Sequence, residues 1–221
     1  MRLVLWGATG QAVVLAELYD RLGLSIAALF DNDPQAQSPL PGVPLFYGRD
    51  ALARWARSTD LRNVAGLAAI GGSRGEDRVE IHALFEAHGI AVATATHPTA
   101  FIARDATLGK GSQVLAMAAV AARADIGDAC IVNTSASVDH GSRLEEGVHV
   151  GPGAHLAGEV HVGRFAFIGT GAAVLPRVRV GERSVVGAGS VVVRDVPPGA
   201  VVAGNPAVHL APRRPPSAKE A

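Results

Sequence analysis

A branched aliphatic residue returns at every sixth position between residues 102 and 192, without a break. Helices repeat every 3.6 residues and strands every two, so neither element alone accounts for this spacing. A six-residue period is typical of a parallel β-helix, in which each hexad supplies one short strand and one turn. The sixteen positions are Ile102, Leu108, Val114, Val120, Ile126, Val132, Val138, Leu144, Val150, Leu156, Val162, Ile168, Val174, Val180, Val186 and Val192.

Two further regularities accompany the aliphatic positions. The residue two places earlier is usually small, as at Ala118, Cys130 and Ser142, and a glycine often follows the aliphatic. Three hexads would make one triangular coil of about 18 residues, and coils would stack about 4.8 Å apart through backbone hydrogen bonds. We expect the aliphatic side chains to fill the interior, the small residues to fit its corners, and the glycines to permit the turn geometry. Those glycines are Gly109, Gly127, Gly151, Gly163, Gly169, Gly181 and Gly187.

Residues 1–97 follow a different pattern, in which short apolar runs alternate with helical segments. Strands are predicted in "RLVLWGA", "SIAALFD", "VAGLAAIGG" and "IAVAT", and "NDPQAQSPLPGVP" is predicted as a loop. Helices are predicted in "TGQAVVLAELYDRLGL", "GRDALARWARS" and "EDRVEIHALFEAHG". The first helix has its apolar spacing at Val14, Leu15, Leu18 and Leu22, with Gly23 as its C-cap. This alternation predicts a small parallel sheet of four strands.

The change of pattern at "HPTA" divides the chain into three predicted segments. Residues 1–97 form a Rossmann-like α/β domain, residues 98–210 form an all-β parallel β-helix, and the Pro-rich residues 211–221 form a disordered tail.

Composition excludes several classes of protein. Lysine plus arginine and aspartate plus glutamate balance at 20 each, so no charge bias favours nucleic acid or an anionic membrane surface. The single cysteine, Cys130, excludes an internal disulfide framework. No apolar run of about 18 residues indicates a membrane span, and the N-terminal residues lack the apolar core of a signal peptide. We therefore expect a cytoplasmic protein with no membrane or nucleic-acid partner.

Three loops of the first domain follow strand ends, where parallel sheets bind their ligands. They are "GATGQ" (7–11), "DND" (31–33) and "GGSRG" (71–75). The first leads into a helix N-terminus, whose free N–H groups favour an anion such as phosphate. It lacks the complete dinucleotide fingerprint G-x-G-x-x-G, so a nicotinamide-dependent reductase is a distant alternative that would leave the hexads unexplained.

The hexad run, the preceding "GATGQ" domain and the closing "GAVVAGNPAVHL" resemble the hexapeptide-repeat sugar acyltransferases. This family includes bacterial nucleotide-amino-sugar N-acetyltransferases and sialic acid O-acetyltransferases. The resemblance implies a left-handed β-helix, a homotrimer, acetyl-CoA as cosubstrate, and an active site between neighbouring prisms. It further implies that the nucleotide of the acceptor binds to the first domain and that a histidine of the prism is the general base.

The resemblance assigns candidate residues on the prism. His140, in "NTSASVDHGS", matches the catalytic base, and His149, Thr170 and Ala188 match positions that contact acetyl-CoA. Many relatives carry an acidic residue directly after the histidine, where this chain has Gly141. The supporting acid is therefore left open between Asp139, Glu145 and Glu146, and adjacent side chains such as those of Asp139 and His140 tend to diverge.

The resemblance also assigns acceptor-binding residues on the first domain. Thr9, Gly10 and Gln11 match a segment that touches the acceptor, although relatives often have histidine in place of Gln11. Asp31 and Asn32 match an acidic pair that holds the base or ribose, with an amide here in the second place. Ser73, after the third strand, is expected to face the sugar or phosphate.

Two other groups of residues are expected to have structural roles. His149, His155 and His161 suggest a zinc site, but spacings of six place them on successive faces, so they cannot converge on one ion within a chain. We expect no metal, and we expect His155 and His161 to face outward. Cys130 occupies a small-residue corner and is expected to fill the core rather than act as a nucleophile.

The resulting hypothesis is an acetyl-CoA-dependent N-acetyltransferase that acts on a nucleotide-linked amino sugar. The amine would attack the thioester directly, with His140 accepting its proton. The alternatives are O-acetylation of a sialic-acid-type sugar and a non-catalytic β-helix that only binds. The sequence leaves open the sugar, the nucleotide base and the acceptor atom.

Overall fold

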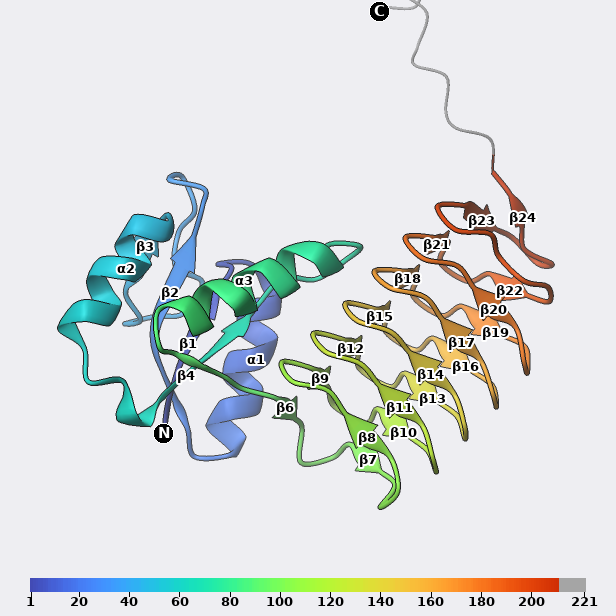
Figure 1. Ribbon diagram of the computed structural model, residues 1–221, viewed down its shortest axis with the longest axis horizontal. Helices are drawn as coiled ribbons and strands as arrows, with labels where there is room; N and C mark the ends of the chain where they lie inside the picture. Colours follow the sequence, from blue (N-terminus) through green and yellow to red (C-terminus); the bar gives the residue numbers. More distant parts are fainter. Residues whose placement is uncertain (211–221) are drawn as a thin grey trace, which may run out of the picture.

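The computed structural model describes residues 1–210, which form a strand-and-helix domain followed by a prism of stacked coils (Figure 1). The predicted disordered tail, 211–221, lies outside these residues. The first domain contains a parallel sheet with strand order β3-β2-β1-β4-β5. Its strands are β1 (Arg2–Trp6), β2 (Ser25–Asp31), β3 (Leu45–Tyr47), β4 (Val64–Ala68) and β5 (Ala91–Val92). Its helices are α1 (Gly10–Arg21), α2 (Arg49–Ser58), the short 3₁₀ helix η1 (Leu61–Asn63) and α3 (Gly75–Ala87).

Helices cover both faces of this sheet, because successive residues of a strand point to opposite sides. α1 covers one face, and α2 and α3 cover the other (Figure 1). The first core contains Leu3, Leu5, Leu15 and Leu18, and the second contains Val4, Trp6, Leu52 and Phe85. A sheet buried on both faces explains why its strands are continuous apolar runs in the sequence.

The predictions for this domain were correct in outline and wrong in three details. The sheet has five strands rather than four, because β3 pairs with β2 directly after the predicted loop. β3 has three residues and lies at the sheet edge, so it is too short to show a periodic pattern. On α1, Leu15 and Leu18 are buried as predicted, but Val14 and Leu22 are exposed. The C-cap is Leu22 rather than Gly23, which follows it in the left-handed conformation with φ 68°.

The second domain is a three-sided parallel β-helix, whose strands fall into three sheets called here faces 1, 2 and 3. Face 1 contains β6 (Ala95–Thr96), β9 (Gln113–Val114), β12 (Ile131–Val132), β15 (His149–Val150), β18 (Phe167–Ile168), β21 (Val185–Val186) and β23 (Val201–Ala203), with antiparallel β24 (Val208–His209). Face 2 contains β7 (Phe101–Ile102), β10 (Ala119–Val120), β13 (Ser137–Val138), β16 (His155–Leu156), β19 (Ala173–Val174) and β22 (Val191–Val192). Face 3 contains β8 (Thr107–Leu108), β11 (Asp125–Ile126), β14 (Arg143–Leu144), β17 (His161–Val162) and β20 (Arg179–Val180).

The turns between faces form three edges. Edge 1–2 contains residues 115–118, 133–136, 151–154, 169–172 and 187–190; edge 2–3 contains 103–106, 121–124, 139–142, 157–160 and 175–178; edge 3–1 contains 109–112, 127–130, 145–148, 163–166 and 181–184. Residues 18 apart in the sequence pair on neighbouring coils, as Val132 does with Val150. A side chain on any edge therefore lies directly beside the residue one coil, or 18 positions, away.

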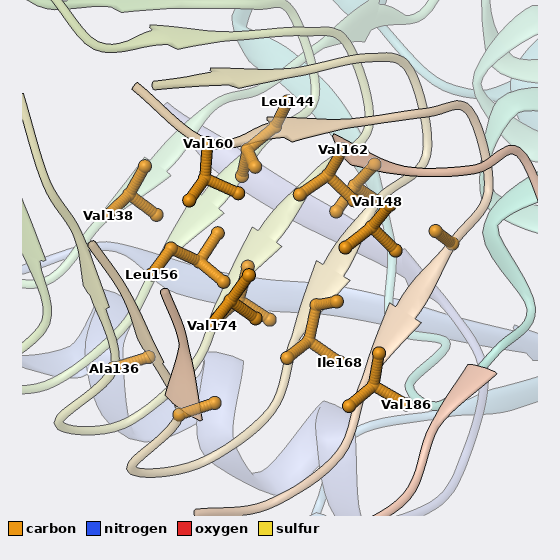
Figure 2. Close-up of a cluster of buried hydrophobic side chains, with 14 of the residues drawn as sticks. Ala136, Val138, Leu144, Val148, Leu156, Val160, Val162, Ile168, Val174 and Val186 are labelled. Atoms are coloured by element: carbon orange, nitrogen blue, oxygen red, sulfur yellow. The ribbon is translucent and has the colours of Figure 1, made fainter. Parts of the chain in front are cut away.

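The predicted aliphatic row forms the interior of the prism. Each aliphatic is the second residue of its strand, and from Val114 to Val192 all of them are buried. Figure 2 shows part of this core, including Val138, Leu156 and Val174, with side chains from different strands directed toward one another. Ile102 and Leu108, in the first coil, are partly buried and pack against the same core.

The predicted role of the glycines that follow the aliphatics was wrong. None of the seven has a positive φ; the left-handed position is two residues later, where Met117, Arg183 and Gly171 have φ of 56°, 54° and 67°. The glycines are needed because neighbouring coils approach closely. A Cβ on Gly169 would lie 2.6 Å from the backbone N of Ala188.

Helix α3 lies along edge 3–1 and joins the two domains. The Gly75 Cα packs against the Gly147 carbonyl, the Arg78 Nε donates to the Ala129 carbonyl at 2.8 Å, and the His82 ring packs on Gly111. These contacts descend one coil for each turn of the helix. The match follows from dimensions, because the helix pitch of about 5.4 Å is close to the coil spacing of about 4.8 Å.

Arg78 is a fully buried arginine at this junction. Its guanidinium donates to the carbonyls of Ala129 (2.8 Å), Gly147 (2.7 Å) and Ile70 (3.2 Å). Burial lowers the pKa of Arg78 to about 10, so the group stays charged at neutral pH. Ile70 lies two residues after the end of β4. The Arg78 side chain therefore ties the end of the sheet to two coils of the prism.

Substituting Gly169 tests the close approach of coils. We expect Gly169→Ala to lower the free energy of unfolding by about 2–3 kcal/mol, because the new methyl group meets fixed backbone. Gly171→Ala is the matched control, since no atom lies within 4 Å of the position that its Cβ would occupy and only its φ of 67° is unfavourable. We expect this control to lose about 1 kcal/mol in denaturant titrations. Equal losses would contradict the proposed reason for the glycine.

Stability should fall in mild acid because of His82. Desolvation first, and the Arg78 charge second, lower the pKa of His82 to about 4, and its Nε2 accepts a hydrogen bond from the Ala68 N–H at 3.2 Å. The unfolded chain, with a pKa near 6.5, takes up the proton first, so the free energy of unfolding falls as the pH drops from about 6.5 to about 4. The loss from this site reaches about 3 kcal/mol at the lower end.

Denaturant titrations of the wild type and His82→Asn across this range measure the effect. The variant should show the shallower pH dependence, whereas the exposed His209→Asn should match the wild type. An unchanged slope in His82→Asn would remove His82 as the cause.

Candidate active site

A cavity of about 580 Å³ lies at the carboxyl ends of β1, β2 and β4. This is where a parallel sheet is expected to bind its ligand. Four of the six predicted acceptor-binding residues, Thr9, Gln11, Asp31 and Asn32, line it. Gly10 and Ser73 belong to the same loops but are not among the lining residues. The full lining is Trp6, Gly7, Thr9, Gln11, Asp31, Asn32, Asp33, Ala36, Ala69, Ile70, Gly71, Gly72 and Arg74.

Asp31 connects two of the loops around the cavity. Its Oδ2 accepts a hydrogen bond from the Ala8 N–H at 2.8 Å, and its Oδ1 accepts one from the Asp33 N–H at 3.0 Å. The carboxylate thereby fixes the "GATGQ" loop relative to the "DND" loop. Any contact with a nucleotide adds to this structural role.

Gln11 is held by a second glutamine, Gln113, which the sequence analysis did not single out. The Ala68 carbonyl only accepts hydrogen bonds, so the Gln113 amide group at 2.8 Å from it is the NH₂. The Gln113 Oε1 therefore faces Gln11 and accepts from its Nε2 at 2.6 Å. This arrangement leaves the Gln11 Oε1 beside Gly71 in the cavity wall.

Arg74 is the one cationic side chain that lines the cavity, in the part of the chain that the structure describes. It is exposed and pairs with Asp77 at 2.5 Å. Its loop, "GGSRG", was predicted to lie at the ligand site, but Ser73 rather than Arg74 was the predicted contact. The signal for Arg74 in the sequence is a cation in the loop after the third predicted strand, in a cavity whose other charged lining residues, Asp31 and Asp33, are acidic.

His149 lies on face 1 beneath the cavity and is buried. Its Nδ1 donates to the Gly72 carbonyl at 3.0 Å, and its Nε2 lies 3.0 Å from the Asn133 Nδ2. Desolvation lowers the pKa of His149 to about 4, so the ring is neutral at physiological pH. Both ring nitrogens are occupied, and the imidazole links a cavity loop to edge 1–2 at Asn133.

Thr170 and Ala188, the other predicted cofactor-binding residues, lie one above the other on edge 1–2. They are 18 residues apart, and both are exposed. The Thr170 carbonyl accepts a hydrogen bond from the Gly189 N–H at 2.8 Å. The structure therefore places them on one open edge, next to the face that carries His149.

His140 lies on edge 2–3, exposed, in the turn after β13. Its Nδ1 lies 3.0 Å from the Asp139 Oδ1, and the same oxygen accepts a hydrogen bond from the His140 backbone N–H at 2.6 Å. These bonds hold the pKa of Asp139 below its usual value. The expectation that the two adjacent side chains would diverge was wrong. With Nδ1–H directed at Asp139, the Nε2 lone pair is available to accept a proton.

Glu145 and Glu146 do not support His140, because they lie on edge 3–1. The Glu145 Oε1 pairs with the His161 Nε2 at 3.0 Å, and the Glu146 Oε2 pairs with the Arg164 Nη2 at 2.7 Å. Of the three acids left open by the sequence, Asp139 is the one that contacts the imidazole.

The candidate catalytic and acceptor residues do not meet within one chain. The cavity lies over face 1, beside edge 3–1, whereas His140 is on edge 2–3, which borders neither the cavity nor face 1. The predicted cofactor residues occupy face 1 and edge 1–2. One chain therefore presents the parts of the candidate site on different sides of its prism.

The three histidines considered for zinc and the single cysteine lie where structural roles were expected. His149, His155 and His161 lie on faces 1, 2 and 3, and no group of three or more metal-binding side chains occurs within residues 1–210. Burial raises the pKa of Cys130 to about 12, and its thiol donates to the Glu145 carbonyl at 3.0 Å. Across the described range, no helix has the length and apolar character needed to cross a membrane.

Comparison with known proteins covers nearly the whole chain. Residues 159–194 match the family described as "Bacterial transferase hexapeptide (six repeats)". The acetyltransferase domain of PglB from Neisseria gonorrhoeae, in complex with acetyl coenzyme A, is 35% identical, with 95% of this chain and 98% of that chain covered and a TM-score of 0.83. PerB from Caulobacter crescentus, in complex with CoA and GDP-perosamine, is 36% identical, with coverages of 96% and 98% and a TM-score of 0.87.

A more distant structure, WeeI from Acinetobacter baumannii, shares the fold at 24% identity, with 95% of this chain and 100% of that chain covered and a TM-score of 0.83. These likenesses extend over both domains and confirm the predicted fold class, a small Rossmann-like sheet followed by a left-handed parallel β-helix. The chain therefore belongs to the hexapeptide-repeat sugar acyltransferase family.

Proposed function

We propose that this protein transfers the acetyl group of acetyl-CoA to an amino group on a nucleotide-linked sugar. The observation that carries the proposal is the likeness, over both domains, to PerB in complex with CoA and GDP-perosamine. The cavity on the first domain offers the nucleotide a place at the sheet end, with Arg74 as a cation for its diphosphate and Asp31 and Asn32 near the base or ribose. A cytoplasmic location stays a prediction from the sequence.

In the proposed reaction the sugar amine attacks the thioester carbonyl of acetyl-CoA. A C–N bond forms and the C–S bond breaks, so that the acetyl group becomes an amide and CoA leaves as its thiolate. The His140 Nε2 accepts the proton that the amine loses and can return it to the leaving sulfur. Asp139 holds Nδ1–H and stabilises the imidazolium that forms, and a backbone N–H supports the oxyanion.

The cosubstrate would lie along an edge of the prism. CoA is long, and edge 1–2 presents exposed turns on successive coils at Thr170 and Ala188. His149, with both ring nitrogens occupied, would contact the cosubstrate through its ring edge or through the backbone it positions.

We propose a homotrimer, because one chain alone does not complete the site. Face 2 supports this arrangement: its outward row has no charged residue of the Asp, Glu, Lys or Arg type, whereas the row on face 3 is mostly charged or titratable. The face 2 row is Phe101, Ala119, Ser137, His155, Ala173 and Val191; the face 3 row is Thr107, Asp125, Arg143, His161 and Arg179. With face 2 near the threefold axis, edge 2–3 of one copy would lie beside edge 1–2 of the next, and His140 would face the neighbour's cosubstrate edge.

Replacing His140 tests the chemistry. His140→Ala should lower kcat by about 10²- to 10⁴-fold, because the general base is lost, while the variant keeps its melting temperature. The assay uses acetyl-CoA with a panel of UDP- and GDP-amino sugars, and mass spectrometry detects the product. An alkali-stable product indicates an amide, and an alkali-labile product would instead indicate a sugar ester. His209→Ala, exposed on β24 and away from face 2, is the control, and wild-type turnover in His140→Ala would contradict the assignment.

Mixing two variants tests whether the site is shared between copies. His140→Ala removes the base, so this variant should have low activity. Arg74→Met should raise the KM for the acceptor, so it should also have low activity when the acceptor concentration is far below that KM. In mixed trimers, a normal His140 from one copy would meet a normal Arg74 from another, restoring about a quarter of the wild-type activity. A control mixture of His140→Ala with His140→Gln should restore none. No recovery in the first mixture would place both residues in one chain's site.

A further inference from the structure

At one position of the hexad, a single turn of the prism has a glycine, and all the remaining turns have a residue with a side chain. The position lies two residues after each aliphatic, and along the prism it is occupied by Arg104, Lys110, Ala116, Ala122, Asp128, Thr134, His140, Glu146, Pro152, Gly158, Arg164, Thr170, Pro176, Glu182, Ala188 and Arg194. Gly158 is the one glycine in this row. It lies 18 residues after His140, directly beside it on the next coil.

The backbone at Gly158 does not require a glycine. Its φ is not positive, and the left-handed conformation of this turn belongs to Glu159, with φ 62°. Its backbone bonding is also ordinary, since its carbonyl accepts from the Arg177 N–H at 3.1 Å as the turns stack. Gly158 therefore differs from Gly169, which is needed because neighbouring backbone lies too close.

The space beside Gly158 is filled by the imidazole of His140. A Cβ at position 158 would lie 2.6 Å from the His140 Nε2 and 3.0 Å from its Nδ1. The nearest atoms are all in this ring and none is backbone. Although it lies on an edge, Gly158 is buried. Because Gly158 has no side chain, the His140 ring can lie against its backbone while the ring Nδ1 reaches Asp139.

We propose that Gly158 is a positioning residue for His140, and this inference rests on the proposed function of that histidine as the base. The bare backbone at Gly158 lets the ring lie against the neighbouring coil, and Asp139 then fixes its rotation from the other side. Any side chain at position 158 displaces the ring from Asp139 and misdirects Nε2. The effect on stability is small, because an exposed histidine side chain can rotate away at little cost.

The experiment is a kinetic comparison of the wild type, Gly158→Ala, His140→Ala and the double variant. Gly158→Ala should lower kcat by about 10- to 100-fold through misplacement of the base, with the KM values for acetyl-CoA and the amino sugar within about twofold. Adding Gly158→Ala to His140→Ala should cause no further loss. Ala122→Ser is the matched control, because it enlarges the same position one coil before His140, and it should retain wild-type kcat. Wild-type kcat in Gly158→Ala overturns the proposal.

A second measurement tests the positioning without any acetyl transfer. The ¹⁵N spectrum of histidine-labelled protein reports which ring nitrogen of His140 carries the proton when the ring is neutral. The wild type should show one dominant Nδ1–H form, and Gly158→Ala should show a mixture. An identical His140 signal in both proteins rejects the positioning role. A changed signal in a protein with no transferase activity would uphold the contact and reject the proposed function instead.

The melting temperature distinguishes displacement of the ring from damage to the coil. Gly158→Ala should melt within about 2 °C of the wild type, since a small loss of stability shifts the melting temperature little in a chain of this size. If Gly158→Ala unfolds, the double variant decides: recovery of folding when His140 is alanine confirms the ring contact, and continued unfolding overturns it.

Discussion

The parallel backbone hydrogen bonds between coils are the constraint on which the rest of this structure depends. They place residue n beside residue n+18 and set one spacing of about 4.8 Å for the whole prism. At that spacing a backbone that passes close to its neighbour has no room for a Cβ, as at Gly169. The same spacing nearly equals the pitch of an α-helix, so α3 can contact successive coils with successive turns and bind the first domain rigidly to edge 3–1.

This junction combines close packing with buried polar groups. Arg78 satisfies its guanidinium with backbone carbonyls rather than with a carboxylate, and burial keeps His82 and His149 neutral at physiological pH. Each of these groups bonds to an atom of the other domain or to the end of the sheet. A buried polar group left without a partner costs more than a satisfied one contributes, and hydrogen bonds are directional, so these bonds fix the relative position of the domains more sharply than apolar contacts would.

The sequence allowed prediction of what repeats, and it did not allow prediction of what depends on neighbours in space. The aliphatic row, the three faces and the separation of His149, His155 and His161 follow from the period of six alone. The role of the seven glycines could not be inferred, because a glycine required for left-handed φ and one required for close approach look the same in a sequence. β3 was too short to show a period. Arg78 and Gln113 act through carbonyl groups of distant segments, which no local pattern reveals.

The candidate site shows the same division. Thr9, Gln11, Asp31 and Asn32 could be placed at the cavity because strand order brings loop ends together. The acid that contacts His140 could not be chosen, because Asp139 owes its role to a turn that folds its carboxylate back over both N–H groups of the next residue.

The arrangement of the three edges explains why a prism of this kind would act as an assembly rather than alone. Edge 3–1 is contacted by α3 along its first coils. Face 1 is covered by the first domain as far as His149, which leaves edges 1–2 and 2–3 exposed on either side of the uncharged face 2. The cavity over face 1 and the proposed base, His140 on edge 2–3, are separated within a chain by the full width of the prism. In the proposed homotrimer, rotation about an axis near face 2 would remove that separation, since it would bring the edge that carries His140 beside the neighbour's edge next to its cavity. The absence of Asp, Glu, Lys and Arg from face 2 and the division of the candidate site would then both follow from the proposed symmetry.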